Sequence, residues 1–210
     1  MKTLIVEIQY FAPVDLYFAL INSKYCSFEQ YETWQKMSFR NRCMVAGAGG
    51  PIELSIPVEN GREQRAMIKD VKIAERENWR VRHWRTIESC YNKSPWFEFH
   101  RDGLENLYAR PEKFLFDWNL KCFEWVMSRL KISTPFGFTE EYQKEYPEKE
   151  FLDLRNKITP KTIRLANKPF PKWEGKYIQV FENKTGFIPH LSVLDFLFCE
   201  GNSGELMQKN

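Results

Sequence analysis

The first 28 residues of the chain carry the pattern that most restricts its fold. An apolar run over residues 3–8 predicts a buried strand, Pro13 begins a helix over 14–22, and residues 25–28 predict a second strand. These elements form a β-α-β unit, which places ligands at the carboxyl ends of its strands. We therefore expect an α/β fold, a single domain whose mixed β-sheet is flanked by helices.

The composition fits a folded chain with one substantial core. Of the 210 residues, 43% are apolar and 28% are charged, which is ordinary for a soluble protein. Aromatic residues make up 16% and bury much area each, so they indicate a thick core or an aromatic-walled pocket. Because Gly201 ends the last predicted helix, we expect a domain over residues 1–201 and a flexible tail over 202–210.

Charge and metal-binding residue types argue against several classes of partner. A net charge of +3 is too small to indicate a nucleic-acid partner. The three histidines are scattered and no C-x-x-C pair occurs, so we expect no metal and no cofactor. The expected partner is a small-molecule substrate, an activated acyl or sugar derivative, and the sequence does not indicate an oligomeric state.

The apolar runs and the thiols indicate a cytoplasmic protein. No apolar run approaches the roughly 20 residues that a membrane-spanning helix needs. The first run contains Glu7, which argues against a signal peptide. The five cysteines are odd in number, widely spaced and set among apolar neighbours, as in proteins with reduced core thiols.

Residues 34–58 hold the main candidate for a ligand site. Arginine forks bind carboxylates and other anions with two parallel hydrogen bonds, so a cluster of cations and amides suits an anionic ligand. A solvated charged loop is the alternative. After the cluster, two strands joined by a turn over 47–51 predict a hairpin. The cluster comprises Gln35, Lys36, Arg40, Asn41 and Arg42.

Two observations favour Asn41 and Arg42 as residues that line a site: the strand ends of the β-α-β opening face this stretch, and no metal or nucleotide signature competes with it. Alternation along the chain points Arg40 the other way. Gln9 and Tyr10 follow the first strand and would stand at its carboxyl end, close to the cluster. Since no glycine-rich phosphate fingerprint accompanies that strand, a dinucleotide site is disfavoured.

His83 is the histidine with the clearest functional alternative. A helix predicted over 75–93 places Trp79, His83 and Cys90 on one stripe, between apolar neighbours. A hydrogen-bonded core histidine is one interpretation. The other is a general base, since the ordinary pKa of histidine lies near neutrality.

The other predicted elements follow from periodicity, capping residues and breakers. Asn119 falls in the buried sector of the longest helix and must be hydrogen-bonded. The charged, proline-rich part of the chain over 140–176 is expected to be a surface excursion. In chain order, the elements are a strand over 67–74, a helix to residue 108 capped by Ser94, a helix over 112–131, an edge strand over 134–138 and a strand over 177–181.

The last helix begins with a capping box. Ser192 is the predicted cap and Asp195 stands at its third position, with Leu191 and Phe196 as the hydrophobic staple. Asp195 is therefore either a structural cap residue or a substrate-binding carboxylate.

Several stretches together resemble a known family. They are Tyr-Phe-x-Pro at 10–13, Gln-Lys-Met-Ser-Phe-Arg-Asn-Arg-Cys at 35–43, Leu-Ser-Ile-Pro-Val at 54–58, the aromatic and proline positions Trp79, His83, Trp84, Tyr91 and Pro95, and the closing segment over 186–198. Across nearly its whole length the chain resembles the WbqC-like protein family, in the form common in Bacteroidetes-type bacteria. The chain lacks the Gln-Pro and Gly-Tyr-Phe pieces of the family's opening motif.

The resemblance implies a role in surface-polysaccharide biosynthesis, including O-antigen, and a glycine (aminoacyl) or acyl transferase activity. In that scheme Asn41 and Arg42, with Lys36, hold an anionic donor or stabilise developing negative charge, and His83 deprotonates a sugar acceptor. Tyr10 positions the acceptor. Gln35 and Asp195 are further substrate-binding candidates.

Two other classes stay open. A nucleotide- or nucleotide-sugar-binding enzyme would use the strand–loop–helix–strand opening, although the chain lacks a His-x-Gly-His motif. A non-catalytic interaction protein, or a nucleic-acid binder, would use the arginines over 76–85. Glutamates interrupt that basic face, whereas phosphate binding favours a continuous one.

Overall fold

The opening strand lies inside a four-stranded parallel sheet. The computed structural model describes residues 1–61, 65–76, 78–165, 167 and 169–202. β1 (Thr3–Glu7) and β2 (Tyr25–Glu29) are parallel neighbours connected by α1 (Val14–Ile21), which confirms the β-α-β opening. β5 (Phe136–Phe138) and β6 (Phe151–Asp153) extend the sheet at its two edges, giving the order β5-β2-β1-β6.

The predicted hairpin forms a second, separate sheet. β3 (Arg42–Gly47) pairs antiparallel with β4 (Gly50–Ser55), in a register that runs from Arg42 opposite Ser55 to Gly47 opposite Gly50. Gly50 adopts a φ of +120°, which residues with a side chain rarely reach, so the glycine permits this turn. The α/β class with parallel and antiparallel strands is therefore confirmed.

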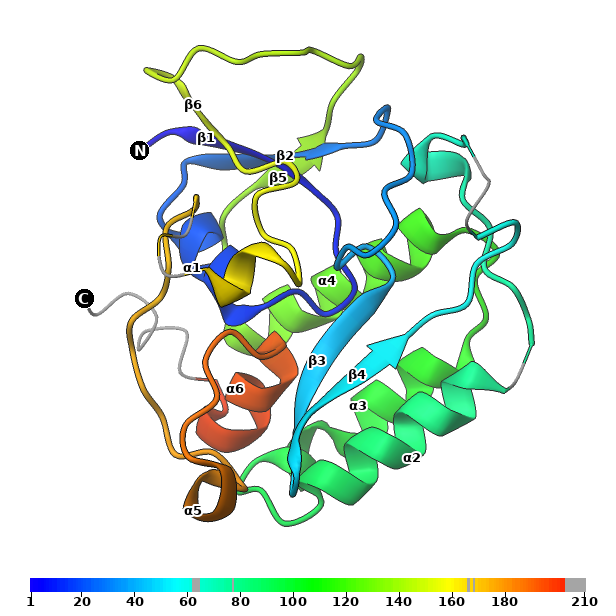
Figure 1. Ribbon diagram of the computed structural model, residues 1–210, viewed down its shortest axis with the longest axis vertical. Helices are drawn as coiled ribbons and strands as arrows, with labels where there is room; N and C mark the ends of the chain where they lie inside the picture. Colours follow the sequence, from blue (N-terminus) through cyan, green and yellow to red (C-terminus); the bar gives the residue numbers. More distant parts are fainter. Residues whose placement is uncertain (62–64, 77, 166, 168, 203–210) are drawn as a thin grey trace.

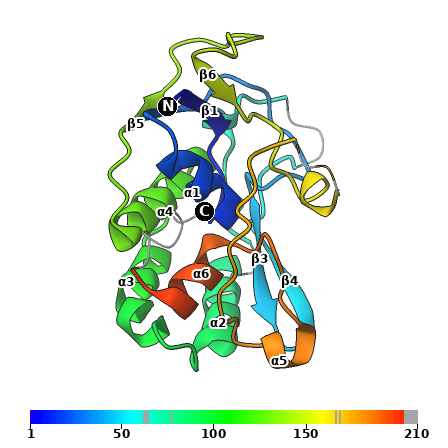
Figure 2. The ribbon, with the colours of Figure 1, turned by 90° about the vertical axis from the view of Figure 1, so that its left-hand side faces the viewer.

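Helices cover one face of the parallel sheet and one face of the hairpin. Figure 1 shows the sheet at the top, the hairpin below it, and α2 and α3 beside the hairpin. α6 contacts α1, α3, α4 and β3, and Figure 2 shows it beside the hairpin. The helices are α2 (Trp79–Tyr91), α3 (Phe97–Ala109), α4 (Leu115–Leu130), α5 (Glu182–Thr185) and α6 (Val193–Glu200), with short 3-10 turns at Ile68–Asp70 and Thr162–Arg164.

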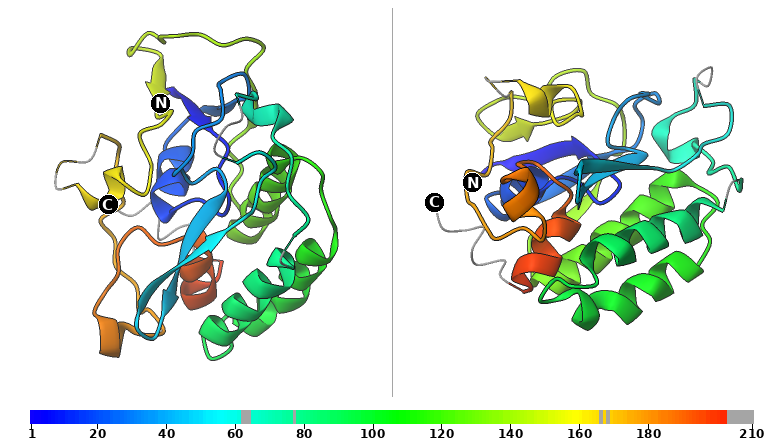
Figure 3. Two further views of the ribbon diagram at one scale, coloured as in Figure 1. Left: turned by 45° about the vertical axis from the view of Figure 1, so that its right-hand side comes forward. Right: turned by 60° about the horizontal axis from the view of Figure 1, so that its bottom comes forward.

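The two faces of the parallel sheet have different surroundings. One face packs on α4, where the Phe123 ring lies 4.9 Å from Phe28 and 5.1 Å from Phe136. Alternate residues of β1 and β2, beginning with Thr3 and Tyr25, point to the other face. The segment between β5 and β6, and the chain from β6 to the Thr162–Arg164 turn, run over that side (Figure 3).

Three predicted elements differ from the structure. The strand over 67–74 is wrong: the segment makes a 3-10 turn and isolated bridges, such as Val58 with Ile73. The strand over 177–181 is also wrong, because the segment is extended but pairs with no strand of the described chain. The excursion over 140–176 contains β6, which the charged sequence concealed.

The helix caps were predicted in part. Ser192 caps α6, since its Oγ accepts a hydrogen bond from the Leu194 N–H at 3.3 Å. Ser94 does not cap α3; its hydroxyl donates to the Tyr91 carbonyl instead. All five thiols are free and buried, and Asn119 donates to the Arg40 carbonyl at 2.7 Å. Residues 203–210 of the predicted tail lie outside the described residues.

Candidate functional site

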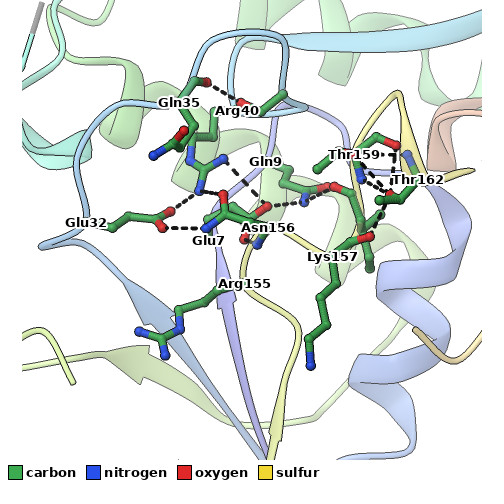
Figure 4. Close-up of polar contacts among 12 residues, drawn as sticks. Glu7, Gln9, Glu32, Gln35, Arg40, Arg155, Asn156, Lys157, Thr159 and Thr162 are labelled. Atoms are coloured by element: carbon green, nitrogen blue, oxygen red, sulfur yellow. Dashed lines mark hydrogen bonds and ion pairs between the residues drawn. The ribbon is translucent and has the colours of Figure 1, made fainter. Parts of the chain in front are cut away.

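A buried network of charges, here called the Arg40 network, occupies the carboxyl ends of β1 and β6. The Arg40 guanidinium is 0% exposed and lies among Glu7, Glu32 and Asn156 (Figure 4). Its Nη2 donates to a Glu32 carboxylate oxygen and to Asn156 Oδ1, the latter at 2.9 Å. Its Nη1 lies 3.8 Å from Glu7 Oε1. Arg40, expected to point away, is therefore the central cation of this edge.

Asn156 closes the network and ties β6 to β1. Its backbone N–H donates to Glu7 Oε2 at 2.9 Å, and its side-chain amide donates to Glu32 Oε2 at 3.1 Å. It adopts a φ of +57°, in the left-handed region that asparagine tolerates better than most residues. Gln9 adds a second tie, donating to Glu7 at 3.0 Å and to the Ile158 carbonyl at 3.2 Å.

The electrostatics of the Arg40 network indicate a structural role. Burial raises the pKa of the Glu7 carboxyl, the Arg40 charge opposes this rise, and the Glu32 charge adds to it. Because the guanidinium and both glutamates are sealed from solvent, a ligand cannot reach them in this arrangement. The network instead fixes the chain that follows β6, which contributes to a nearby pocket.

A second polar group, the His190–Asp15 pair, does border a cavity. His190 Nδ1 lies 2.8 and 3.0 Å from the two carboxylate oxygens of Asp15. Asp15 lies in the first turn of α1, is fully buried, and also accepts from the Trp173 N–H at 3.2 Å. Since an ionised carboxylate only accepts hydrogen bonds, Nδ1 carries a proton and Nε2 is the nitrogen left for a ligand.

The cavity beside this pair, here called the His190 pocket, has a volume of about 290 Å³. Met44, Ile163 and Ile188 supply apolar walls, whereas Glu53 and Arg164 supply opposite charges. Pockets of this kind, apolar with a few convergent polar groups, are the usual form of small-molecule sites.

The backbone around His190 is held in an unusual conformation. His190 has a φ of +61°, a region that costs free energy for a residue with a side chain. The chain on its carboxyl side is fixed, since the Leu191 carbonyl accepts from Val14 at 3.1 Å and the Ser192 N–H donates to Met44 at 2.8 Å. The ring is thus positioned by α1 and β3 together.

Two of the predicted site residues, Tyr10 and His83, are in contact but sealed. The Tyr10 hydroxyl lies 2.9 Å from His83 Nδ1 and also bonds to the Tyr108 hydroxyl. His83 is 2% exposed, and burial lowers its pKa to about 4, so the ring is neutral at pH 7. The contact makes them part of the core under the hairpin.

The predicted residues of the cationic stretch separate. Arg42 and Glu53 lie on the outer face of the hairpin, where Arg42 donates to both Glu53 carboxylate oxygens at 3.0 Å. Glu53 lines the His190 pocket, so Arg42 contacts a residue of the pocket wall. Asn41 is buried and donates to the Ile56 carbonyl at 2.8 Å. Gln35 and Lys36 are exposed, and the Gln35 carbonyl accepts from Ser38.

Asp195 is buried in a different place and does not complete a capping box. It accepts from the Tyr177 hydroxyl at 2.6 Å, the Tyr91 hydroxyl at 2.7 Å and the Gln179 amide at 3.0 Å. Burial raises the pKa of its carboxyl, and these three hydrogen bonds oppose the rise. The carboxylate holds the extended segment around Tyr177 against α6.

Sequence reasoning did not single out His190 or Asp15. Both lie in segments that drew attention for other reasons, the closing segment over 186–198 and the first predicted helix. They are 175 positions apart, so no local spacing reveals the contact. A polar residue inside an otherwise apolar first turn of α1 was the available signal for Asp15.

Among the residues that the structure describes, no group of three or more His, Cys, Asp or Glu side chains is arranged to hold a metal ion. Within the same residues, no helix is long and apolar enough to cross a membrane.

Comparison with known proteins gives one result. A family model, that of the WbqC-like protein family, matches residues 9–163. The matched part includes Asp15 and the whole hairpin and ends before His190. No curated protein and no solved structure was found to match the chain.

Proposed function

The chain belongs to the WbqC-like protein family, and we propose that it is a transferase that moves an acyl or aminoacyl group, such as glycyl, onto a sugar in surface-polysaccharide biosynthesis. One observation carries this proposal: a histidine held by a buried carboxylate faces a pocket of small-molecule size. A base of this kind is what acyl transfer to a hydroxyl or amine requires.

The His190–Asp15 pair would act as the general base. His190 Nε2 takes the proton from the acceptor hydroxyl or amine as its oxygen or nitrogen attacks the donor carbonyl carbon. The new C–O or C–N bond forms, the bond from that carbon to the leaving group breaks, and the imidazolium returns its proton to the leaving group. Asp15 keeps the ring in one tautomer and stabilises the imidazolium.

The charged walls of the pocket would bind the donor. Arg164 lines the pocket, so an anionic group on the donor would meet positive charge there. Arg42 would contribute by neutralising the Glu53 carboxylate, which otherwise repels an anion. We therefore assign the role of base to His190 in place of His83, and we keep Arg42 as a donor-binding residue. Tyr10 and His83 would support the pocket from the core below the hairpin.

The test is a transfer assay with the purified protein. Glycyl and acetyl thioesters serve as donors, nucleotide-linked and lipid-linked sugars as acceptors, and mass spectrometry detects the acylated sugar. We expect His190→Gln to lower the rate by about 10²- to 10⁴-fold, the usual contribution of a general base. The control is His100→Gln, because His100 is a buried histidine that does not line the pocket. Full activity of His190→Gln, or no transfer with any donor and acceptor, would contradict the proposal.

A nucleotide-binding function receives less support. Nucleotides in parallel α/β sheets bind at the carboxyl ends of the strands. In this chain the carboxyl ends of β1 and β6 are filled by the Arg40 network. A thermal shift with a nucleotide or a sugar nucleotide that Arg164→Met abolishes would favour this alternative.

A further inference from the structure

The face of the parallel sheet that points away from α4 carries a second cavity, here called the open-face groove. Its volume is about 720 Å³. The side chains of Thr3, Ile5, Tyr25 and Ser27 line it, all from the same face of β1 and β2. The segment between β5 and β6 closes it from the outside. The groove shares no lining residue with the His190 pocket.

Arg155 does not line the groove but ties the segment that covers it to the sheet. Its side chain is 6% exposed, and it pairs with Asp153 at 2.7 Å and with Glu29 at 3.3 Å. It donates to the Gln143 carbonyl at 2.7 Å, and its guanidinium lies 4.9 Å from the Tyr146 ring centroid. A buried cation that is paired to the sheet and bonded to the covering segment keeps the two apart at a fixed spacing.

Aromatic rings stand on both sides of the groove. Tyr25 leans from β2 over β5, so closely that a Cβ at Gly137 would lie 2.1 Å from its hydroxyl oxygen. Gly137 therefore leaves the room in which the Tyr25 ring lies. Across β1, Phe151 on β6 packs on Tyr146 with ring centroids 5.0 Å apart. Tyr25 is 37% exposed, so its ring is available to a ligand.

The polar groups of the groove select the chemistry of that ligand. Ser27, Thr139 and Gln143 offer hydroxyl and amide groups, and Glu140 and Glu141 offer carboxylates. No lysine or arginine occurs among the described residues that line the groove, so phosphates and carboxylates would meet repulsion. Aromatic faces beside hydroxyl, amide and carboxylate acceptors suit a molecule with both apolar C–H faces and many hydroxyl groups.

We propose that the open-face groove binds an uncharged stretch of a saccharide chain, with one sugar ring packed on Tyr25 and another near Phe151. The inference does not depend on the transfer reaction, because it uses none of the residues of the His190 pocket.

The experiment follows Ile5, which lies in the floor of the groove. Protein labelled at the isoleucine methyl groups is titrated with maltohexaose, cellohexaose and chitohexaose, and the methyl resonances are recorded by NMR. We expect at least one of these saccharides to shift the Ile5 resonance. Tyr25→Leu, which keeps apolar bulk and removes the ring, should weaken binding about tenfold, the change that corresponds to loss of one aromatic contact.

Two control variants show whether the saccharide binds in the groove and nowhere else on the protein. Phe99→Ala removes an aromatic residue that is 65% exposed on α3 and should leave the affinity unchanged. His190→Gln should bind the saccharide as the wild type does, even if it has lost transfer activity. The inference is overturned if none of the three saccharides shifts the Ile5 resonance, or if Tyr25→Leu binds as tightly as the wild type. Spermine is titrated as a cationic comparison, and a shift of the Ile5 resonance with spermine alone would also overturn the inference.

Discussion

His83 and His190 each have a polar side chain within hydrogen-bonding distance of Nδ1, but His83 is sealed in the core and His190 borders a cavity. His83 lies on a regular helix and bonds to the Tyr10 hydroxyl inside the core. His190 lies on irregular backbone with a positive φ, bonds to a buried carboxylate and borders a cavity. A neutral hydroxyl stabilises no charge on the ring, whereas a carboxylate stabilises the imidazolium.

The difference separates a histidine sealed in the core from one that borders a cavity. A general base must accept a proton during the reaction and must be reached by the acceptor. Burial lowers the pKa of His83 to about 4, so protonating it near neutral pH is unfavourable. We therefore expect sealed polar clusters in this fold to act on stability and the His190 pocket to act on activity.

Arg40→Met provides the strongest test of this division. It leaves Glu7 and Glu32 buried without their cation, and breaking a buried pair in this way typically costs about 3–5 kcal/mol of stability. The matched control is Arg164→Met at the His190 pocket, where we expect a loss below about 1 kcal/mol. Both are measured by urea unfolding. A loss below about 1 kcal/mol for Arg40→Met, as small as that expected for the control, would show that the Arg40 network does not stabilise the fold.

The pH dependence of stability tests the sealed state of His83. Its pKa is about 4 in the folded protein and about 6.5 in the unfolded chain, so the unfolded state binds more protons between these values. The wild type should therefore lose up to about 3 kcal/mol relative to His83→Gln as the pH falls from 6.5 to 4.

The measurement is urea unfolding of both proteins across this pH range. Burial also lowers the pKa of His100 to about 4, but His100 is present in both proteins and cancels in the difference. The raised pKa values of Glu7 and Asp195 cancel in the same way. Parallel stability curves for the two proteins would mean that folding does not lower the pKa of His83.

Asp15→Asn tests whether the Asp15 carboxylate supports His190 as a general base. An asparagine of the same shape does not stabilise the imidazolium and can favour the wrong tautomer, so the rate of the transfer reaction should fall about 10- to 100-fold, as when the partner that orients a histidine is lost. The acidic limb of the pH profile should also move, because that limb reports the general base of a reaction. Asp70→Asn on an exposed 3-10 turn is the control. A lower rate with an unmoved pH profile would mean that Asp15 serves the fold alone.

The elements set by local pattern were predicted, and those set by distant contacts were not. The β-α-β opening, the hairpin and the long helix α4 follow from periodicity, proline and glycine within each segment. β6 is three residues long and exists because Thr3 and Ile5 pair with it, which its own sequence does not show. The segment over 177–181 has the composition of a strand, but side-chain bonds to Asp195 hold it in place of a neighbouring strand.

In the candidate site, too, local patterns were predicted and contacts between distant residues were not. The helical stripe identified His83 as an inward-facing residue, and the structure confirms that it is hydrogen-bonded in the core. Asp15 and His190 meet only when the closing segment returns to the first helix, through bonds such as Val14 to Leu191. Alternation failed for Arg40, because it lies before β3 in irregular backbone where a period of two does not apply.

Arg42→Ala has the smallest expected effect. It tests whether the Arg42–Glu53 pair belongs to the His190 pocket or only to the surface of the hairpin. Its pairing with Glu53 is on the outer face of the hairpin, where Glu53 is 41% exposed, and ion pairs of this kind contribute at most about 1 kcal/mol to stability. Glu53 nevertheless lines the His190 pocket, so removal of its partner should raise the KM for the donor and leave kcat unchanged. The control Arg101→Ala breaks an exposed pair with Glu88 on α2 and α3 and should change neither constant. A fall in kcat with an unchanged KM would place Arg42 in the chemical step, and no change in either constant would confine it to the surface of the hairpin.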